Sequence, residues 1–365
     1  MGASIQDAAL RDFSAGQIGK VSFGTRLAQG LSAIILVIPY ALMLGGLALC
    51  ALNFPNLITL VLGGTVSAVG FYVRPRRHRL EGEVFTRSDL PELFALTDEI
   101  SQRLGGKPVT KVQIFSDFNA FSTELQGDRV LGIGLGLWLI LSPEERVALI
   151  AHEVSHQVNG DQARTGLLSM GLYSVERWYS LFEDSAIVDH EGYYLREQGI
   201  EDAIGGGLAA VVAMLVEQLW LVLKRFSFLD SQRAEYLADG IATKAAGIEA
   251  VQKLLRKLGY ERLLRRAFLE MAPNLVPNGT AFFDQLCGKA NSATVEVRAG
   301  LEARMAEEVH CVDMSHPPTV ERIGFLAKLT KTQDAPISYR EKIDAELAPF
   351  IEAEGVKMLQ MLEVQ

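Results

Sequence analysis

Two histidines stand four residues apart in the stretch "ALIAHEVSHQVNGD", residues 148–161. On a helix, residues i and i+4 share a face, so His152 and His156 would direct their ring nitrogens toward one point. Glu153 directly follows the first histidine, which places a carboxylate beside that point rather than on it. The pattern predicts a metal ion held by both histidines, with Glu153 as the general base for a metal-bound water.

The residues before this stretch favour a helix. Ser142 precedes Pro143, and two acidic residues follow in what would be the first turn, an arrangement typical of a helix start. An ordinary helix with solvated polar residues is the alternative. A chain with only 6 histidines forms this spacing rarely by chance, which favours the metal site.

The third metal ligand must come from another part of the chain. A hydrolytic zinc site normally has three protein ligands and leaves the fourth position to water. A longer form of the motif has a third histidine six residues after the second, but Gln162 stands there, and Asn159 replaces its glycine. The stretch "SQRAEYLADGIA", residues 231–242, offers Glu235 and Asp239 one helical turn apart. One carboxylate could bind the metal while the other accepts a proton from a histidine ring.

The N-terminal part of the chain predicts a membrane anchor. No charged residue occurs from Leu27 to Val73, a run long enough for two crossings of about 20 residues each. The break "NFPN", residues 53–56, supplies a turn. We therefore expect a transmembrane hairpin of two helices, 30–52 and 57–73. A buried hairpin in a soluble protein is the alternative.

Charge sets the expected orientation of that anchor. Arg26 precedes it and the run "RPRRHR", residues 74–79, follows it, while the turn carries no charge. Excess Lys and Arg mark the cytoplasmic side, so we expect both flanks and the globular part in the cytoplasm, at the inner (plasma) membrane. The formal net charge is −9, with the acidic excess after residue 80. This acidic charge argues against nucleic acid as a partner. We expect the lipid bilayer to be a partner instead.

The region after the anchor predicts both helices and strands. Residues 87–106, "RSDLPELFALTDEISQRLGG", form an amphipathic pattern with Ser88 or Asp89 as the helix cap. Residues 109–117, "VTKVQIFSD", alternate like a strand. Residues 129–141, "RVLGIGLGLWLIL", are a second extended or buried apolar segment, too short to cross a membrane.

Another apolar run, Ile204–Leu223, lies between the two proposed ligand stretches. Because all ligands must lie on one side of a membrane, the number of crossings between His156 and Glu235 must be even. The companion would be Arg164–Phe182, which carries internal charges. We therefore expect two long helices that cover the site or dip into the membrane surface, with residues 207–220 as a candidate cover. A spanning pair is the alternative.

Taken together, these stretches resemble the M48 family of membrane-associated zinc peptidases. The matching stretches follow the family's order: "FNAF" (118–121), the histidine motif, "RAEYLAD" (233–239) and "SHPPTVERI" (315–323). The resemblance implies an α+β, predominantly α-helical fold. This is a zincin-like (gluzincin) metallopeptidase domain with a small β-sheet, preceded by the transmembrane hairpin.

The resemblance also implies roles for single residues. Glu235 would be the third ligand of one Zn²⁺ per chain, and Asp239 the outer partner of a ligating histidine. His316 would donate a hydrogen bond to the developing oxyanion. Substrate backbone would be held near an edge strand by Asn119, Ala120 and Phe121.

The sequence as a whole predicts a membrane-anchored zinc endopeptidase that cuts protein or peptide substrates, in quality control of membrane or misfolded proteins. A substrate-specific maturation protease and a non-catalytic zinc-binding scaffold are the alternatives. The expected division is a cytoplasmic segment 1–29, the hairpin 30–73, the peptidase domain 74–335 with an apolar insertion at about 163–224, and a C-terminal helix 336–365.

Overall fold

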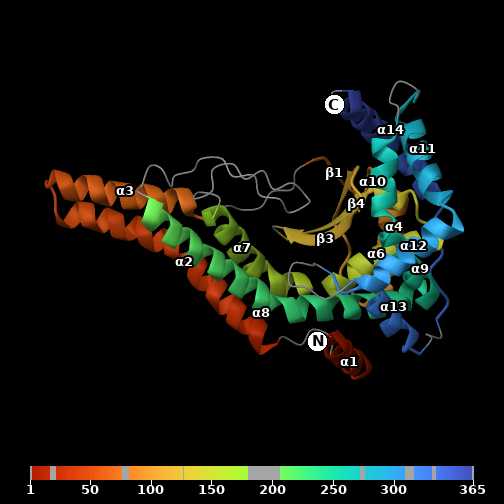
Figure 1. Cartoon of the computed structure of the whole chain (residues 1–365), viewed down its shortest axis with the longest axis horizontal. Coiled ribbons are helices and arrows are strands. Elements are labelled where there is room, and N and C mark those ends of the chain that lie inside the picture. Colours follow the sequence, from red (N-terminus) through yellow and green to blue (C-terminus); the bar gives the residue numbers. More distant parts are fainter. Residues whose placement is uncertain are drawn as a thin grey trace. The chain divides into compact units, whose positions relative to one another are not determined.

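The computed structural model describes residues 2–16, 22–75, 82–125, 127–179, 206–271, 276–308, 316–330 and 334–363 (Figure 1). Several expectations fall outside these residues, namely the basic run beyond Pro75, residues 180–205 of the apolar insertion, and Ser315. The chain divides into two compact units. We call them the sheet unit (1–20, 79–162 and 231–365) and the apolar unit (21–78 and 163–230).

The described residues are mostly helical with one small sheet, which confirms the predicted balance of helix and strand. The helices of the sheet unit are α1 (Gly2–Ser14), α4 (Pro91–Leu104), α5 (Leu135–Trp138), α6 (Pro143–Val158), α9 (Ile248–Leu258), α10 (Glu261–Leu269), α11 (Gly279–Asn291), α12 (Val295–Glu307), α13 (Thr319–Ala327) and α14 (Lys342–Glu363). Its strands are β1 (Val84–Phe85), β2 (Lys111–Phe115), β3 (Ala120–Leu125) and β4 (Asp128–Gly134). The apolar unit contains α2 (Phe23–Leu52) and α3 (Leu57–Val73). Two helices contribute to both units, α7 (Asp161–Tyr179) and α8 (Gly206–Ala246).

The four strands form one sheet in the order β1-β2-β4-β3. β2 and β4 are parallel, whereas β3 runs antiparallel to β4 with Ala120 opposite Ile133. β3 therefore lies at an edge of the sheet. β4 forms the first part of the predicted apolar segment 129–141, but the segment then turns into α5. At Gly136 the backbone N–H donates to the carbonyl of Ser116 at 3.2 Å, and a Cβ atom there would lie only 3.1 Å from that oxygen, so glycine suits this close approach.

α6 is the central helix of the sheet unit. It packs against α4, α9 and β3, and every residue from Glu145 to Ser155 is buried. Its start is as predicted, because the Ser142 side chain accepts a hydrogen bond from the backbone of Glu145 while the Glu145 carboxylate accepts one from Ser142. This reciprocal cap satisfies two backbone donors that a helix start leaves open.

The cap predicted for α4 is wrong. Neither Ser88 nor Asp89 caps that helix. The Asp89 carboxylate accepts from the backbone N–H of Thr86 at 2.7 Å and closes the preceding turn. Two N–H groups in the first turn of α4 instead donate to the Glu346 carboxylate of α14, at 2.6 and 3.0 Å. Glu346 is far from α4 in the sequence, so the residues around the start of α4 could not identify it as the partner.

In the apolar unit, α2 begins at Phe23, earlier than the residue 30 that we expected. Ser22 caps the helix by accepting from the backbone of Thr25 at 3.1 Å, and the Asp230 carboxylate accepts from the backbone of Ser22 at 3.1 Å. Among the described residues, α2 alone is both long and apolar enough to cross a bilayer, and α3 is apolar but shorter.

Small residues bring α2 and α3 into backbone contact. A Cβ atom on Gly46 would overlap the carbonyl oxygen of Gly63. The Ser67 hydroxyl of α3 donates to the carbonyl of Met43 in α2 at 3.0 Å. Close approach through small residues, with a hydroxyl bonded across the pair, is how helices associate where apolar surroundings offer no other polar partner.

Candidate metal centre

The two histidines of α6 lie one helical turn apart in the sheet unit and converge as the sequence indicates. The Nε2 atoms of His152 and His156 are 3.2 Å apart, and their rings are nearly perpendicular at 88°. His152 is buried and His156 is half-buried. The capped and buried helix α6 fixes the two rings at one end of a shared face.

Glu235 of α8 completes a group of three possible ligands. Its Oε2 lies 3.6 Å from His152 Nε2, and its Oε1 lies 3.5 Å from His156 Nε2. Two ligand atoms at about 2.0–2.1 Å from a tetrahedral ion are about 3.3–3.4 Å apart, so these separations suit zinc. The residues present therefore fit a single metal ion.

Asp239 fixes the tautomer of His152. It lies one turn after Glu235 on α8 and is fully buried, with Oδ1 at 3.0 Å from His152 Nδ1. The Nδ1–H group of His152 donates to this carboxylate, which leaves the lone pair of Nε2 directed toward Glu235.

Arg322 of α13 is a site residue to which sequence reasoning assigned no role. Its guanidinium donates to both oxygens of Asp239 at 2.7 Å, and its Nη2 lies 3.3 Å from Glu235 Oε2. Only 3% of its side chain is exposed. Arg322 shares a helix face with the buried Phe325 and Leu326, and a charge on an apolar face needs a buried partner. An arginine on the apolar face of a predicted helix was therefore the sequence feature that could have identified this site residue.

Electrostatics keep both carboxylates ionised. Burial alone raises the pKa of Glu235, but the charges of His316 and Arg322 hold it well below its usual value. Burial likewise opposes ionisation of Asp239, and Arg322 lowers the pKa of that carboxyl below its usual value. A cationic arginine beside two buried acids thus keeps both carboxylates ionised, and the three side chains together carry a net negative charge that attracts a cation.

His316 lies on the exposed side of this group. Its Nδ1 is 2.8 Å from Glu235 Oε2, and 56% of its side chain is exposed. The charge of Glu235 raises the pKa of His316 above its ordinary value. His316 precedes α13, so the same segment brings both His316 and Arg322 to Glu235.

Glu153 is buried next to His152 and is tied to the edge strand. The Ser122 hydroxyl of β3 donates to the backbone carbonyl of Glu153 at 2.7 Å. Glu153 also belongs to the charges that raise the pKa of His316, which lies on another element. The general base expected from the sequence therefore adjoins His152 in α6, and its backbone is bonded to β3.

The predicted substrate-binding residues lie at the start of β3. The carbonyl of Asn119 accepts from Gly134 of β4 at 2.9 Å, so by alternation the backbone groups of Ala120 and Ser122 point to the outer edge of the sheet. The Ala120 N–H donates to the side-chain oxygen of Asn119, Oδ1, at 2.9 Å. The Phe121 side chain lies on the opposite sheet face from Ser122.

The ring of Phe121 packs over Gly132 and stacks on Phe115, with ring centroids 5.7 Å apart. Phe121 thus directs its side chain away from the face that contacts α6. Ser122, on the other face, is the β3 residue that bonds to Glu153.

Comparison with known proteins identifies the class of this site. Residues 93–330 match the model of peptidase family M48, and the chain belongs to that family. It is therefore a metalloprotease, which acts on peptide or protein substrates.

Individual relatives carry the name Protease HtpX. The chain is 28% identical to the protein of Pseudomonas putida (strain W619) over 241 residues, which cover 65% of this chain and 70% of that one. It is 26% identical to the protein of Ectopseudomonas mendocina (strain ymp) over 244 residues, which cover 65% and 72% of the two chains. No solved structure matches the chain.

Proposed function

We propose that this chain is a zinc-dependent endopeptidase that activates water with Glu153. The observation that carries the proposal is the convergence of His152, His156 and Glu235, whose ligand atoms are separated by 3.2, 3.5 and 3.6 Å. When bound, zinc supplies a Lewis acid that polarises the scissile carbonyl and lowers the pKa of water to about 7.

The residues around the three ligands then have distinct tasks. Glu153 takes the proton of the attacking water and delivers it to the leaving amine. Asp239, held by Arg322, orients the ring of His152. His316 stands at the exposed side of Glu235, where its imidazole would donate a hydrogen bond to the oxyanion.

The outer edge of β3 would hold the substrate backbone. An extended peptide that pairs with Ala120 and Ser122 lies beside Glu153, because Ser122 is bonded to the Glu153 carbonyl. Main-chain hydrogen bonds ignore side-chain identity, so this mode of binding accepts many sequences and suits unfolded substrates. Asn119 would support the first residue of this edge through its bond to Ala120.

Membrane attachment is the second part of the proposal. The apolar unit exposes large hydrophobic side chains on α2 and α3, which include Ile34, Val37, Leu44, Ile58, Val61 and Leu62. A surface of this kind suits lipid rather than water. We assign α2 and α3 to a transmembrane hairpin of the inner membrane with the peptidase domain, residues 74–335, on the cytoplasmic side.

α7 and α8 carry similar exposed residues. Leu167 and Met170 of α7 and Met214 and Leu215 of α8 are between 37% and 59% exposed. We propose that these faces contact the surface of the bilayer. A membrane-bound peptidase that accepts many extended sequences is suited to quality control of membrane or misfolded proteins.

Metal content tests the ligand assignment. Detergent-purified protein, stripped with a chelator and reloaded, should hold one zinc per chain. His156→Ala and Glu235→Gln should lose both the zinc and the cleavage of an unfolded protein. His316→Ala should retain the zinc and lose most of the activity. Unchanged zinc content in both ligand variants would show that the metal lies elsewhere.

A further inference from the structure

The N-terminal helix α1 packs against α13, although the two helices are far apart in the sequence (Figure 1). α1 also lies outside residues 93–330, the part of the chain that matches the family model. Its Ile5 and Ala9 are buried in the core of the sheet unit, and the half-buried ring of Phe13 packs against the same core. α1 is therefore an integral part of the sheet unit.

α1 contacts α8 next to the residues of the candidate metal centre. A Cβ atom on Gly240 would lie only 2.8 Å from the ring of Phe13, so the two helices meet here at close range. Gly240 directly follows Asp239, the carboxylate that orients a ligating histidine. The Asp12 carboxylate of α1 pairs with Arg233 of α8 at 2.8 Å. α1 thus contacts α8 both before and after the stretch that supplies the two buried carboxylates.

α1 contacts α13 on both sides of Arg322. The side-chain Nε2 of Gln6 donates to the backbone carbonyl of Glu321 at 2.8 Å. The ring of Phe13 meets the ring of Phe325 edge-on, with centroids 6.3 Å apart. Phe325 is fully buried and follows Arg322 by three residues. In each helix, residues that contact α1 therefore flank one partner of the ion pair between Asp239 and Arg322.

That ion pair links α8 to α13, and its geometry decides where Asp239 stands relative to His152. Ligands of a metal need support that holds them within about 0.5 Å of the productive geometry. We propose that α1 is a positioning element of the metal centre, in which Phe13 fixes α8 against α13 and so keeps Asp239 bonded to His152. Phe13 is not a proposed ligand and acts only through Asp239. This inference rests on the proposed zinc peptidase function.

Two substitutions disturb this contact from opposite sides. Phe13→Ala removes the ring that touches both α8 and α13, and Gly240→Ala places a Cβ where this ring lies, so the ring must shift. Each should weaken zinc binding by about tenfold, the lower end of the effect of losing an outer partner of a ligand. Competition with a fluorescent chelator measures the affinity on the full chain in detergent.

Peptide cleavage provides a second measurement. Each of the two substitutions should lower kcat for a quenched fluorescent peptide and leave KM within about twofold, because the proposed substrate edge on β3 keeps its structure. Phe13→Leu keeps the apolar bulk of the side chain and should recover most of both the zinc affinity and kcat.

The effects of Phe13→Ala and Gly240→Ala should not add. The Phe13→Ala chain has room for a Cβ at position 240, so the second substitution should cause no further loss of zinc affinity there. Residues that act through one shared contact show this non-additivity, whereas independent residues give additive effects. Additive losses would overturn the proposed action through this contact.

Gly279→Ala separates positioning from general stability. A Cβ on Gly279, at the start of α11, would lie 2.0 Å from the carbonyl oxygen of Glu352 in α14. The substitution should lower the melting temperature without touching α1, α8 or α13. Zinc affinity and kcat should therefore stay at the wild-type values.

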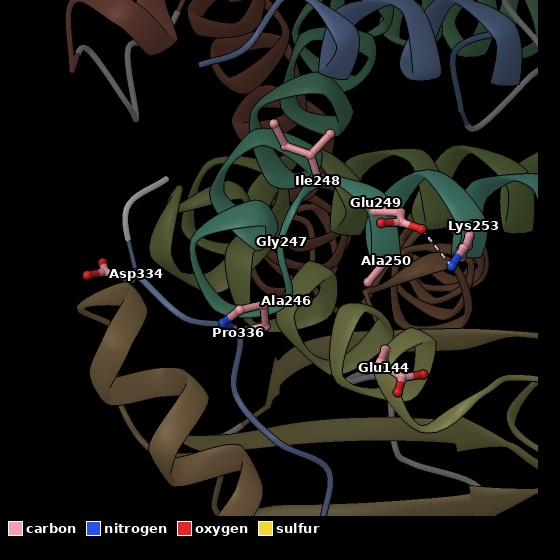
Figure 2. Close-up of a pocket in the computed structure, with 9 residues that line it drawn as sticks. All are labelled: Glu144, Ala246, Gly247, Ile248, Glu249, Ala250, Lys253, Asp334 and Pro336. Atoms are coloured by element: carbon pink, nitrogen blue, oxygen red, sulfur yellow. Dashed lines mark ion pairs between the residues drawn. The ribbon is translucent and has the colours of Figure 1, made fainter. Parts of the chain in front are cut away.

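The ion pair between α1 and α8 gives a milder test with a matched control. Asp12→Ala should weaken zinc binding by about threefold, since a partly exposed ion pair contributes little. The control is Lys253→Ala, which removes an ion pair of the same length, 2.8 Å to Glu249. Both of these residues line a pocket of about 470 Å³ at the start of α9 (Figure 2). Lys253→Ala should leave zinc affinity unchanged.

The possible failures are distinguishable. A wild type that binds no zinc would overturn the proposed function and this inference with it. Wild-type zinc affinity and kcat in Phe13→Ala would overturn the inference alone, and Gly240→Ala decides in the same way where Phe13→Ala does not fold. An equal loss of zinc affinity in Gly279→Ala would also overturn the inference, because reduced stability would then account for the effect.

Discussion

Arg322 is not a proposed metal ligand, but it contacts both buried carboxylates of the candidate metal centre. It donates twice to Asp239, which in turn accepts from His152. Removing the guanidinium leaves the buried negative charge of Asp239 without its partner, a state that costs several kcal/mol in proteins. The ring of His152 would then lose its fixed orientation.

We therefore expect Arg322→Ala to weaken zinc binding by about 10–100-fold, the usual effect of losing an outer partner of a metal ligand. Arg322→Lys should recover little, because an ammonium group cannot bond both oxygens of Asp239 in the same way. Competition with a fluorescent chelator measures the affinity.

Arg340→Ala is the control for that experiment. Arg340 lies 3.4 Å from Glu92 and 3.2 Å from Glu99, on a half-exposed surface away from the metal ligands. Its loss should leave zinc affinity unchanged. Equal zinc affinity in the wild type and Arg322→Ala would contradict the role assigned to Arg322.

Cys287 gives a pH-dependent prediction. Burial raises the pKa of its thiol to about 12 from an ordinary value of 9.0. At pH 8 about one thiol in ten thousand is then ionised, and the thiolate is the reactive form. Iodoacetamide should label Cys287 only after unfolding, which mass spectrometry of the peptide would show. Rapid labelling of the native protein at pH 8 would contradict its burial.

The raised pKa of Cys287 also makes the free energy of unfolding depend on pH. The folded protein holds the proton of Cys287 more tightly than the unfolded chain does. The thiol therefore contributes its full stabilisation below about pH 9, and this contribution is lost as pH rises toward 12. Cys287→Ser should remove this dependence.

Single residues of the metal centre were partly predictable. The spacing of His152, Glu153 and His156 requires only that the segment be a helix, which Ser142 and Pro143 indicate. Glu235 and Asp239 could be found as a pair, but their division of roles came from resemblance. Arg322 could not be assigned, because its partner depends on how α13 packs against α8.

At the scale of elements, α14 is hydrogen-bonded to the starts of two other helices of the sheet unit, α4 and α11. Its Glu352 carboxylate accepts from the backbone N–H groups of Gly279 and Thr280 at the start of α11, at 3.1 and 2.8 Å. Gly279 and Gly355 bring the two backbones into contact, and a Cβ on Gly279 would overlap the carbonyl oxygen of Glu352. The two helices cannot separate without losing these caps.

Gly279→Ala should therefore lower the free energy of unfolding by about 1–3 kcal/mol, since overpacking forces the backbone to shift. Gly288→Ala is the matched control on α11, because a Cβ there meets nothing within 4 Å. That change should be neutral or stabilising by about 0.5–1 kcal/mol. Thermal unfolding followed by circular dichroism compares the two, and equal midpoints would contradict this contact.

Elements with a local signal were predicted, and those with distant partners were not. α6 and β2 follow from their own patterns of caps and apolar residues. β3 lacks a strong alternating pattern, since it is half-buried along most of its length. α1 was expected only as a flanking segment. Its Ala9 is fully buried in the core of the sheet unit, and its Asp12 pairs with Arg233 at 2.8 Å.

At the scale of the whole molecule, each of the two units is built from segments that are far apart in the sequence. The sheet unit is built from three separate segments, and the apolar unit joins residues 21–78 with 163–230. The sequence predicted an apolar insertion at about 163–224, but nothing local indicates that it packs with α2. Ala28 and Ile35 of α2 are buried together with Leu168 and Leu223.

Membrane topology can be tested with single cysteines in a chain whose native cysteines are replaced by serine. Asn53→Cys lies at the turn between α2 and α3, and Gln102→Cys lies on the exposed side of α4. Both flanks of the hairpin are expected on the cytoplasmic side. An impermeant maleimide should label Asn53→Cys in spheroplasts and Gln102→Cys only after lysis. The reverse pattern would contradict the proposed orientation.

The most direct test of the central claim is zinc-dependent cleavage of an unfolded protein by the wild type and by Glu153→Gln. Both proteins are purified in detergent, stripped with a chelator and reloaded with zinc. Glu153 is not among the proposed ligands, so both should bind one zinc per chain. The wild type should cleave, and Glu153→Gln should lose at least about a hundredfold in rate, because a general base contributes that much or more. Equal cleavage by the two proteins, or none by a zinc-loaded wild type, would contradict the account.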